Sequence, residues 1–508
     1  MPKVALIGAG SAAFSRRLLS DLLHWPEFQG TDLRLVDIDT GRLELIEALA
    51  KKMVAQKGAG VRVTATTDRR RALEGVDYVI TTLAVGFAYE QDRPDVAIPR
   101  RYGVFQTVAD TTGAGGVFRY LRTAPVMLDV TRDMQRLCPD ALLLNYVNPM
   151  NMLMWTISLA TPHIRKVGLC HSVQGTAALL ARFCGVPEDE VAHWVAGINH
   201  QAWFLQLRHH TYRGEDLYPR LREAAQQPET YEKQRVRFEL FRHLGYFVTE
   251  SSHHNAEYAP WFRRTLEERE RYTPLSSLPS HMQLAAVNGL PQPAGNGASR
   301  GEAQAPAEAL VRHAEMWDLI RQQVAGEAPI EFRPPHEYAS YIMHAIETNQ
   351  PYRFNGNVQN SGLITNLPPN CNVEVPILTD NTGLRPCYVG DLPSQLAALN
   401  RLNVNVHELA VRGFLTRDRE SIYQACSLDP LTSASVRLDD IRPMVDELFA
   451  ANARWLDGWE ATAPNGTSSP AGATGHAVSN GPSRAHTAAT VAANGAAGRN
   501  VIVSSSPH

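Results

Sequence analysis

A cysteine and a histidine stand side by side after the short apolar segment Val167 to Leu169, as Cys170 and His171. A second histidine, His200, follows the small-residue turn Ala196 to Asn199. A thiolate and an imidazole form a minimal ligand pair for a divalent metal and leave coordination positions for a substrate. On spacing alone, the commoner roles are a buried cysteine and a hydrogen-bonded turn histidine. Cys170 and His200 therefore form a hypothetical metal pair.

Two asparagines lie in the sequence Asn-Tyr-Val-Asn-Pro-Met-Asn at 145–151, which follows another apolar segment. The side-chain amides of Asn148 and Asn151 could contact a nicotinamide ribose and sugar hydroxyls, although Asn148 could instead cap a helix that starts at Pro149. Asp110 stands beside a glycine-rich loop. Taken alone it is an ordinary turn residue, but it is also a candidate catalytic acid or base.

The segment Gly245 to Tyr258 is dense in groups that transfer protons, and it reads GYFVTESSHHNAEY. Carboxylates, imidazoles and a phenol alternate there with aromatic residues that could form a platform for a sugar. So many polar groups in a core-like setting indicate a functional role for part of this segment, and Tyr258 is one candidate.

The elements that must position these residues begin with a dinucleotide-binding pattern. The first predicted strand ends in Gly8-Ala9-Gly10-Ser11-Ala12-Ala13, a G-x-G-x-x-A turn that opens a helix. Gly8 permits the tight turn, Gly10 lets a pyrophosphate approach the main chain, and Ala13 lets helix and strand pack closely. Asp37 follows the next strand and would accept hydrogen bonds from an adenosine ribose, which favours NAD over NADP. Asp39 is the alternative for that role.

Short apolar segments alternate with amphipathic helices through the first half of the chain, which predicts a parallel, doubly wound sheet. The predicted strands are Lys3 to Ile7, Leu33 to Val36, Val61 to Ala65, Tyr78 to Leu83, Leu142 to Val147 and Val167 to Leu169. We therefore expect an α/β protein with a Rossmann-type domain over residues 1–195 and an α+β substrate- and metal-binding domain over 196–460. Residues 276–306 are expected to form a surface loop, and residues 461–508, poor in large apolar side chains, a disordered tail.

Composition excludes several classes of partner. The chain has 508 residues, 44% of them hydrophobic, with 49 Lys and Arg against 52 Asp and Glu. No charge excess is available to bind nucleic acid or anionic lipid, and no apolar segment has the length of a membrane span. The N-terminus lacks the pattern of an export signal, and the six scattered cysteines predict no disulfide framework. A cytoplasmic protein with a small-molecule substrate is expected.

Taken together, these motifs resemble glycoside hydrolase family 4, and its α-galactosidase branch in particular. The resemblance rests on GAGS, NYVNPM, VGLCHSVQGT, AGINH, GYFVTESSHHNAEY and GLITNLP, which cover residues 2–459 in order. It implies that NAD and a manganese-type ion are cofactors and that Cys170 and His200 are the metal ligands. Co²⁺, Ni²⁺ or Fe²⁺ would also suit these ligand types. It further implies that Asn148 contacts substrate, that His171 protonates the leaving group and that Tyr258 is the base. A dimer or tetramer is expected.

The family's mechanism explains why a hydrolase would carry a dinucleotide-binding domain. The resemblance implies that NAD transiently oxidises carbon 3 of the sugar, which acidifies the proton on carbon 2. Elimination then expels the aglycone, water adds, and the hydride returns. The same chemistry on α-glucosides or α-uronides stays open, with Arg93 or Arg119 reading a uronide carboxylate. So do a simple dehydrogenase for a polyol or hydroxy acid and a non-catalytic NAD-binding protein.

Overall fold

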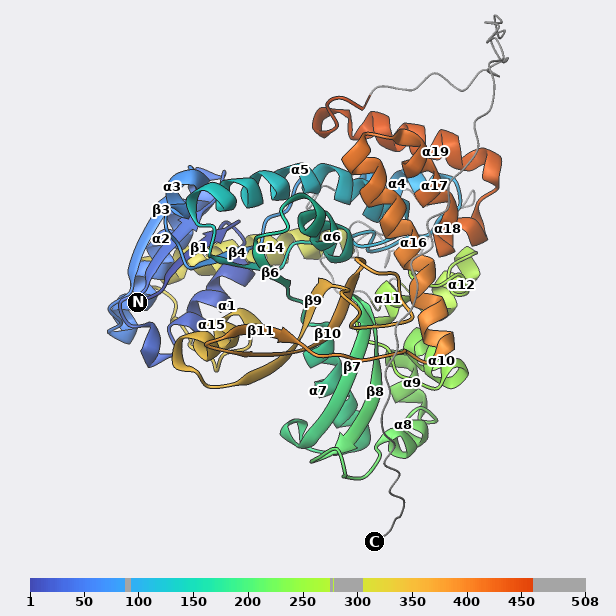
Figure 1. Cartoon of the computed structure of the whole chain (residues 1–508), viewed down its shortest axis with the longest axis horizontal. Coiled ribbons are helices and arrows are strands. Elements are labelled where there is room, and N and C mark those ends of the chain that lie inside the picture. Colours follow the sequence, from blue (N-terminus) through green and yellow to red (C-terminus); the bar gives the residue numbers. More distant parts are fainter. Residues whose placement is uncertain (87–92, 275–276, 278–304, 460–508) are drawn as a thin grey trace, which may run out of the picture. The chain divides into compact units, whose positions relative to one another are not determined.

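A parallel sheet forms the N-terminal part of the protein (Figure 1). The computed structural model describes residues 1–86, 93–274, 277 and 305–459. Six parallel strands lie in the order β3-β2-β1-β4-β5-β6, the order of a dinucleotide-binding fold. They are β1 (Lys3–Ile7), β2 (Asp32–Val36), β3 (Arg62–Thr66), β4 (Tyr78–Thr81), β5 (Leu142–Asn145) and β6 (Arg165–Gly168). The predicted Rossmann-type fold is therefore confirmed, with each strand within two residues of its predicted start.

Helices connect these strands and cover the sheet, as expected for parallel pairs, which need crossover connections. They are α1 (Ala12–Leu22), α2 (Thr40–Lys57), α3 (Arg69–Leu73), α4 (Pro94–Arg101), α5 (Gly113–Leu137), α6 (Met150–Ala160) and α7 (Ser172–Cys184), with the short 3-10 helix η1 (Pro26–Phe28) after α1. The central strands β4 and β5 are buried throughout, so their sequences are mainly apolar rather than alternating, and each ends in a buried polar residue.

Strands that follow β6 in the chain extend the same sheet. β9 (Tyr352–Gln359) pairs antiparallel with β6, and beyond it follow β10 (Asn372–Asp380), β7 (Val191–Ile198) and β8 (Gln201–His209). β11 (Gly383–Pro386) pairs with β10. The described residues thus contain one mixed sheet of 11 strands. The predicted boundary at 195/196 falls inside β7, and the division into two folding units stays a prediction.

The remaining α-helices come from the chain after β8 and pack in several places, with α16 to α19 gathered near α4, α5 and α6 (Figure 1). They are α8 (Tyr218–Ala224), α9 (Pro228–Lys233), α10 (Arg235–Leu244), α11 (Ser252–Asn255), α12 (Leu266–Tyr272), α14 (Ala305–Ala325), α15 (Tyr338–Thr348), α16 (Ser394–Thr416), α17 (Arg419–Leu428), α18 (Pro430–Ser435) and α19 (Leu438–Ala451), with the 3-10 helices η2 (Glu188–Glu190) and η4 (Ala453–Trp455). None of the helices in the described ranges is both long and apolar enough to cross a membrane.

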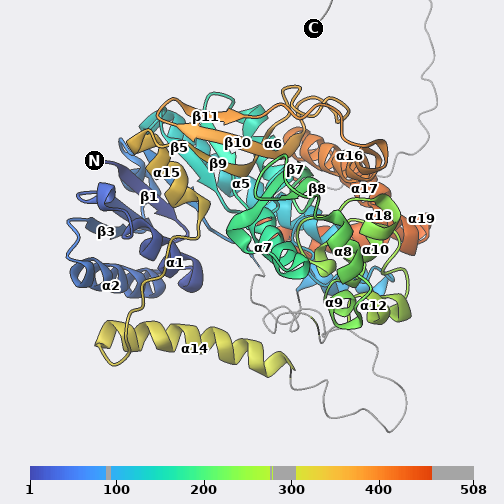
Figure 2. The same ribbon diagram turned by 90° about the horizontal axis from the view of Figure 1, so that it is seen from below.

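One long helix from the second half returns to the dinucleotide-binding part. α14 lies along α2, as Figure 2 shows. Lys52 Nζ of α2 donates hydrogen bonds to the carbonyl oxygens of Gln323, at 3.1 Å, and Val324, at 2.7 Å. The predicted surface loop at 276–306 lies almost entirely outside the described residues, and the predicted disordered tail lies wholly outside them.

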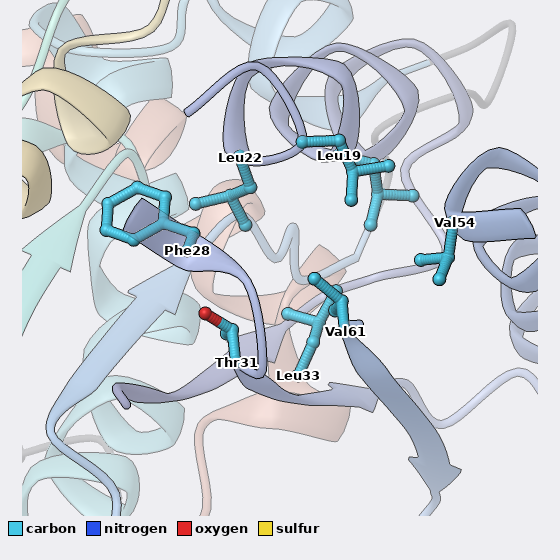
Figure 3. A pocket seen from close by; sticks show the side chains of 8 residues that line it. Leu19, Leu22, Phe28, Thr31, Leu33, Val54 and Val61 are labelled. Carbon is cyan, nitrogen blue, oxygen red and sulfur yellow. The ribbon is translucent and has the colours of Figure 1, made fainter. Parts of the chain in front are cut away.

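A small cavity lies in the apolar core under α1 (Figure 3). Its walls come from α1, η1, β2 and α2, and they are formed by Leu19, Leu22, Leu23, Phe28, Thr31, Leu33, Val54 and Val61. Leu19 and Leu22 point down from the helix towards Leu33 and Val61 in Figure 3. Because the lining holds no charged or titratable group, this cavity belongs to the core and offers nothing for catalysis.

Candidate functional site

The turn between β1 and α1 leaves room for a phosphate group. Gly8 has a φ of +93°, and a Cβ on it would lie 2.6 Å from the main chain that follows β4. A Cβ on Gly10 would lie 2.8 Å from Asp37 Oδ2. Glycine is therefore required at both positions, and the N-terminus of α1 stays open to an anion. Ser11 is the N-cap of α1, and Ala13 lies in its first turn.

Asp37 faces this turn, and Asp39 has another role. Asp37 Oδ2 accepts a hydrogen bond from the main-chain N–H of Gly10 at 2.7 Å. Asp39 is the N-cap of α2, where its carboxylate accepts from the N–H of Arg42 at 3.0 Å and forms an ion pair with that arginine. The geometry favours Asp37 over Asp39 for a ribose contact, because Asp37 is the one that contacts the glycine turn.

A pocket of about 250 Å³ runs from the glycine turn to the carboxyl end of β6. Its lining residues are Ser11, Phe14, Thr82, Tyr146, Asn148, Leu169, Cys170 and His171. Asn148 Nδ2 lies 3.4 Å from Asp110 Oδ2, which brings two of the predicted residues together. The side chain of Asn148 does not cap α6, since that helix begins after Pro149 without a side-chain cap. The pocket thus joins the dinucleotide pattern to the Cys-His pair.

His171 is held by a buried carboxylate. Its Nε2 lies 2.6 Å from Oε2 of Glu337, and its ring stacks with those of Tyr146 and His336. Glu337 is the N-cap of α15, and its main-chain N–H donates to Asp21 Oδ2 at 2.6 Å. Burial alone raises the pKa of Glu337, but the hydrogen bond and charge of His171 hold it below its usual value. A carboxylate partner of this kind fixes the orientation of an imidazole.

His200 sits at the tip of the β7–β8 hairpin, whose turn consists of Asn199 and His200. His200 has a φ of +65°, and its Nδ1 is buried with no hydrogen-bond partner among the described residues. Asn151 holds the tip, since its Nδ2 donates to the carbonyl of Asn199 and its Oδ1 accepts from the N–H of Asn199, each at 3.3 Å. Asn372 donates to the same Oδ1 at 3.0 Å. Asn151 therefore lies buried behind the hairpin, and substrate contact by its amide stays a prediction.

Glu250 completes a group of metal-ligand types with Cys170 and His200. One ligand atom from each of these three residues lies within 4.8 Å of the others. Glu250 lies between α10 and α11 and has a φ of +66°. Burial raises the pKa of the Cys170 thiol, and the charge of Glu250 raises it further. A thiol and a carboxylate held this close favour a cation between them, because the cation stabilises both ionised forms.

Asp110, His200 and His254 form a second group of metal-ligand types, which has His200 in common with the first. One ligand atom from each of these residues lies within 4.8 Å of the others. His254 Nε2 is 3.5 Å from Asp110 Oδ1, and His254 Nδ1 is 3.3 Å from Glu250 Oε1. Burial lowers the pKa of His254, but the two carboxylates outweigh burial and raise it. The same histidine holds the pKa values of Asp110 and Glu250 below their usual range despite burial. Asp110, Glu250 and His254 are thus largely buried groups, and the charges of His254 and of the two carboxylates shift each other's pKa values.

Tyr258 and its neighbour Glu257 belong to the same polar segment as Glu250 and His254. Glu257 is 2% exposed, and its carboxylate accepts hydrogen bonds from the main-chain N–H groups of residues 107, 108 and 109 at 2.7, 2.8 and 3.0 Å. It thereby anchors the loop that carries Asp110. The ring of Tyr258 lies 6.5 Å from that of His200. Burial, reinforced by the charges of Asp110 and Glu250, raises the pKa of Tyr258 well above its usual value.

Glu374 of β10 is a further buried carboxyl at this site. It is 0% exposed and lies opposite Gly197 in the pairing of β10 with β7. Burial and the charge of Cys170 raise its pKa well above the usual value, which favours its protonated form.

Backbone strain gathers at the same place. Among the described non-glycine residues, seven have positive φ, and Ala109, His200 and Glu250 are three of them. Each such conformation costs about 1–3 kcal/mol and persists where the surrounding structure imposes it, as at binding and catalytic sites.

The predicted residues are thus brought together in large part, and others join them. Cys170, His171 and Asn148 line one pocket, and Asp110 lies against Asn148. His200 lies near Cys170, and Tyr258 lies near His200. Glu250, His254, Glu257, Glu337 and Glu374 were not singled out in the sequence. The dense polar segment at 245–258 contains the first three, but it does not show which member faces the metal pair. Glu337 and Glu374 carry no local pattern that could have identified them.

The two halves of the chain match sequence profiles for known domains. Residues 3–186 match the profile described as Family 4 glycosyl hydrolase, and residues 195–432 match the one described as Family 4 glycosyl hydrolase C-terminal domain. An alpha-galactosidase of Bacillus subtilis (strain 168) is 39% identical over 460 residues, which are 90% of this chain and 99% of the relative. An alpha-galactosidase of Rhizobium meliloti (strain 1021) is 34% identical over 456 residues, 89% of each chain. More distant relatives are named alpha-glucosidase and alpha-galacturonidase.

The fold also matches solved structures of glycosidases. A 6-phospho-alpha-glucosidase from gut microorganisms, crystallised with NAD and Mn²⁺, superimposes with a TM-score of 0.72 at 20% identity, covering 89% of this chain and 98% of that one. At that identity the likeness concerns the fold. The sequence matches extend over both halves and over 90% of the chain, and on this ground the protein belongs to family 4 of the glycosyl hydrolases.

Proposed function

We propose that this protein hydrolyses α-galactosides with NAD and a divalent metal ion, Mn²⁺ in the first place, as cofactors. The observation that carries the proposal is the convergence of Cys170, His200 and Glu250 within 4.8 Å, with Cys170 lining the pocket that begins at the glycine turn. An oxidisable sugar bound in that pocket would have a dinucleotide on one side and a metal on the other.

The residues present fit both cofactors. Gly8 and Gly10 leave a cradle that a Cβ would fill, at the N-terminus of a helix, as a pyrophosphate requires. Thiol, imidazole and carboxylate are metal-ligand types, and Nδ1 of His200 is buried without a hydrogen-bond partner in the described part of the chain. When bound, NAD would supply a reversible hydride acceptor, and the ion would supply a Lewis acid and a positive charge beside the Tyr258 phenol.

The chain's own residues supply binding and proton transfer. Asn148 binds sugar hydroxyls from the pocket wall. Tyr258 takes the proton from carbon 2 of the sugar and, after this proton has exchanged with solvent, delivers a proton to the same carbon. His171, oriented by Glu337, gives a proton to the departing glycosidic oxygen. A water molecule then adds at carbon 1, so the balanced products are the free sugar and the alcohol.

The choice of α-galactosides rests on relatives and on charge. The relatives from Bacillus subtilis and Rhizobium meliloti, at 39% and 34% identity, are alpha-galactosidases. An α-uronide would need a cation to bind its carboxylate, and the two candidates are already engaged. Arg93 donates hydrogen bonds to the carbonyls of Val108 and Ala109, at 3.1 and 3.4 Å, and Arg119 interacts with the charge of Asp110. A neutral hexoside suits this pocket better.

The test compares nitrophenyl α-galactoside with the α-glucoside and the α-uronides in reducing buffer. NAD, Mn²⁺ and thiol are each omitted in turn, and a parallel reaction is run in D₂O. We expect the fastest release of nitrophenol from the galactoside, strict dependence on both cofactors, and deuterium at carbon 2 of the released sugar. Faster release from another glycoside would correct the substrate. NADH accumulating in step with product would indicate a dehydrogenase, and NAD binding without turnover a non-catalytic protein.

A further inference from the structure

A second group of metal-ligand side chains lies at the far end of the β7–β8 hairpin from His200. Glu190 of η2 and the adjacent residues His209 and His210 each offer one ligand atom, and these three atoms lie within 4.8 Å of one another. Oε2 of Glu190 is 2.8 Å from Nε2 of His209 and 3.4 Å from Nε2 of His210.

The main chain explains why two consecutive residues converge on one carboxylate. Successive side chains of a strand point to opposite faces of the sheet, so His209 and His210 would normally diverge. β8 ends at His209, however, and His210 has a φ of +61°. The main-chain N–H of His210 donates to the carbonyl of Glu190 at 2.6 Å. This turn brings both imidazoles to the same side, stacked with centroids 4.1 Å apart.

We propose that Glu190, His209 and His210 bind a zinc-type divalent ion at a site separate from the catalytic one. Two imidazole nitrogens and one carboxylate oxygen are a known three-ligand set for Zn²⁺, with the fourth position left to water. Ligand atoms around a tetrahedral Zn²⁺ lie roughly 3.3–3.5 Å apart, as follows from bonds of about 2.0–2.1 Å. The 3.4 Å separation between Glu190 and His210 fits this value, and the 2.8 Å contact between Glu190 and His209 needs to open by only a few tenths of an ångström.

Exposure and position separate this site from the chemistry of the pocket. The side chain of His209 is 26% exposed, that of His210 58% and that of Glu190 34%, so water can reach the open position of the ion. His200 and His209 stand at opposite ends of the nine-residue strand β8, roughly 30 Å apart at about 3.4 Å per residue. An ion bound here would tie η2 to the end of β8 and close the base of the hairpin.

The experiment counts Zn²⁺ sites on the chelator-stripped full-length protein, by competition with a chromophoric chelator. The Cys170→Ser background removes a ligand from the catalytic group. In that background we expect a Zn²⁺ site that is weakened at least tenfold by His210→Ala or by Glu190→Gln, distinct from any ion held by Asp110, His200 and His254. His243→Ala is the matched control, because His243 pairs with Glu239 at 3.6 Å without a second histidine. The control should leave binding unchanged.

Two further measurements keep the outcome clear. His210→Ala in the otherwise unaltered protein should retain full glycosidase activity, which shows that the variant folds and that the site is separate. Anomalous diffraction at the zinc edge should show an ion between the two Nε2 atoms and Glu190. Equal Zn²⁺ affinity of the parent and both site variants, an equal loss in His243→Ala, or an anomalous peak elsewhere would overturn the proposal.

Discussion

At the scale of single residues, the proposed function makes the greatest demand on Cys170, since burial and Glu250 raise the pKa of a thiol that would have to ionise to bind a metal. We expect Cys170→Ser to lose the catalytic metal and at least a hundredfold in turnover, while the thermal unfolding of the metal-free protein changes little. Metal analysis after dialysis, enzyme assays and calorimetry of the stripped protein measure these effects. Full activity of the serine variant would remove Cys170 from the metal site. Activity of the parent should also fall under oxidising conditions.

Asp21 leads to a prediction about pH. It is 1% exposed, and burial raises its pKa to about 6 from a usual value of 3.8. Between about pH 4 and 6 the folded protein therefore binds more protons than the unfolded chain, so this carboxyl lowers stability as pH rises through that window. Asp21→Asn keeps an oxygen for the N–H groups of His336 and Glu337. It should remove this slope and make the protein about 1–3 kcal/mol more stable at pH 7.

Urea unfolding at half-unit steps of pH, for parent and variant, measures the difference. If the two stability curves run parallel from pH 4 to 7, the pKa of Asp21 is not raised in the folded protein.

The family resemblance predicted that Cys170 and His200 act together, and their ligand atoms do lie within 4.8 Å of each other. Residue types and spacing alone were not enough, because a buried cysteine and a hydrogen-bonded turn histidine are the commoner roles. Glu250 could not be distinguished from its polar neighbours, since its orientation depends on a left-handed main-chain conformation at that residue. Asn151 lies behind the hairpin tip, a placement that no pattern along the chain indicates. Glu337 reaches His171 from 166 residues away, a contact set by tertiary packing alone.

At the scale of elements, the loop at 106–110 depends on one carboxylate from another segment. In Glu257→Gln, an amide NH₂ would face main-chain N–H groups that now donate to the carboxylate. The ion pair with Arg263, at 3.2 Å, would also be lost. A buried donor left unpaired costs about 1–3 kcal/mol. We expect a stability loss of at least that size and a turnover at least tenfold lower, because Asp110 moves with the loop.

Urea unfolding and steady-state kinetics test this role. The control is Glu268→Gln, which removes an i,i+4 ion pair with the exposed Arg264 and should change stability by less than about 1 kcal/mol. Similar losses in both variants would mean that Glu257 does not anchor the loop.

Local sequence was also sufficient for most of the Rossmann-type half. Apolar runs between glycine turns placed the limits of β1 at Lys3 and Ile7, and the other strands differ from their predicted limits by no more than two residues. The placement of β9 beside β6, with β10 next to β9, could not be predicted from local sequence. Both strands come much later in the chain, and local pattern does not specify their antiparallel neighbours.

At the scale of the whole molecule, the shared sheet predicts cooperative folding of residues 1–460. β6 has β9 as its neighbour, Tyr78 of β4 donates to Glu347 at 2.7 Å, and α14 packs on α2. We expect a single calorimetric transition for the metal-free protein. A fragment of residues 1–195 should not fold stably, because it would expose the β6 edge and the helix faces now covered by the second half. Circular dichroism and proteolysis of that fragment measure this.

A stably folded fragment, or two separate transitions, would instead support the division at 195/196 into two folding units. The dimer or tetramer expected from the family stays a prediction that sedimentation can test.

The β6–β9 seam also bears on engineering. Relatives differ in the substrate they are named for, so chimeras that exchange one half of the chain are a natural design. A crossover near residue 190 would pair β6 of one parent with β9 of the other, two strands that did not evolve together. Gly168 and Asn357, paired across the seam, show how little tolerance there is, since a Cβ at Gly168 would lie 3.0 Å from that of Asn357. A successful hybrid would have to inherit both flanks of the seam from the same parent.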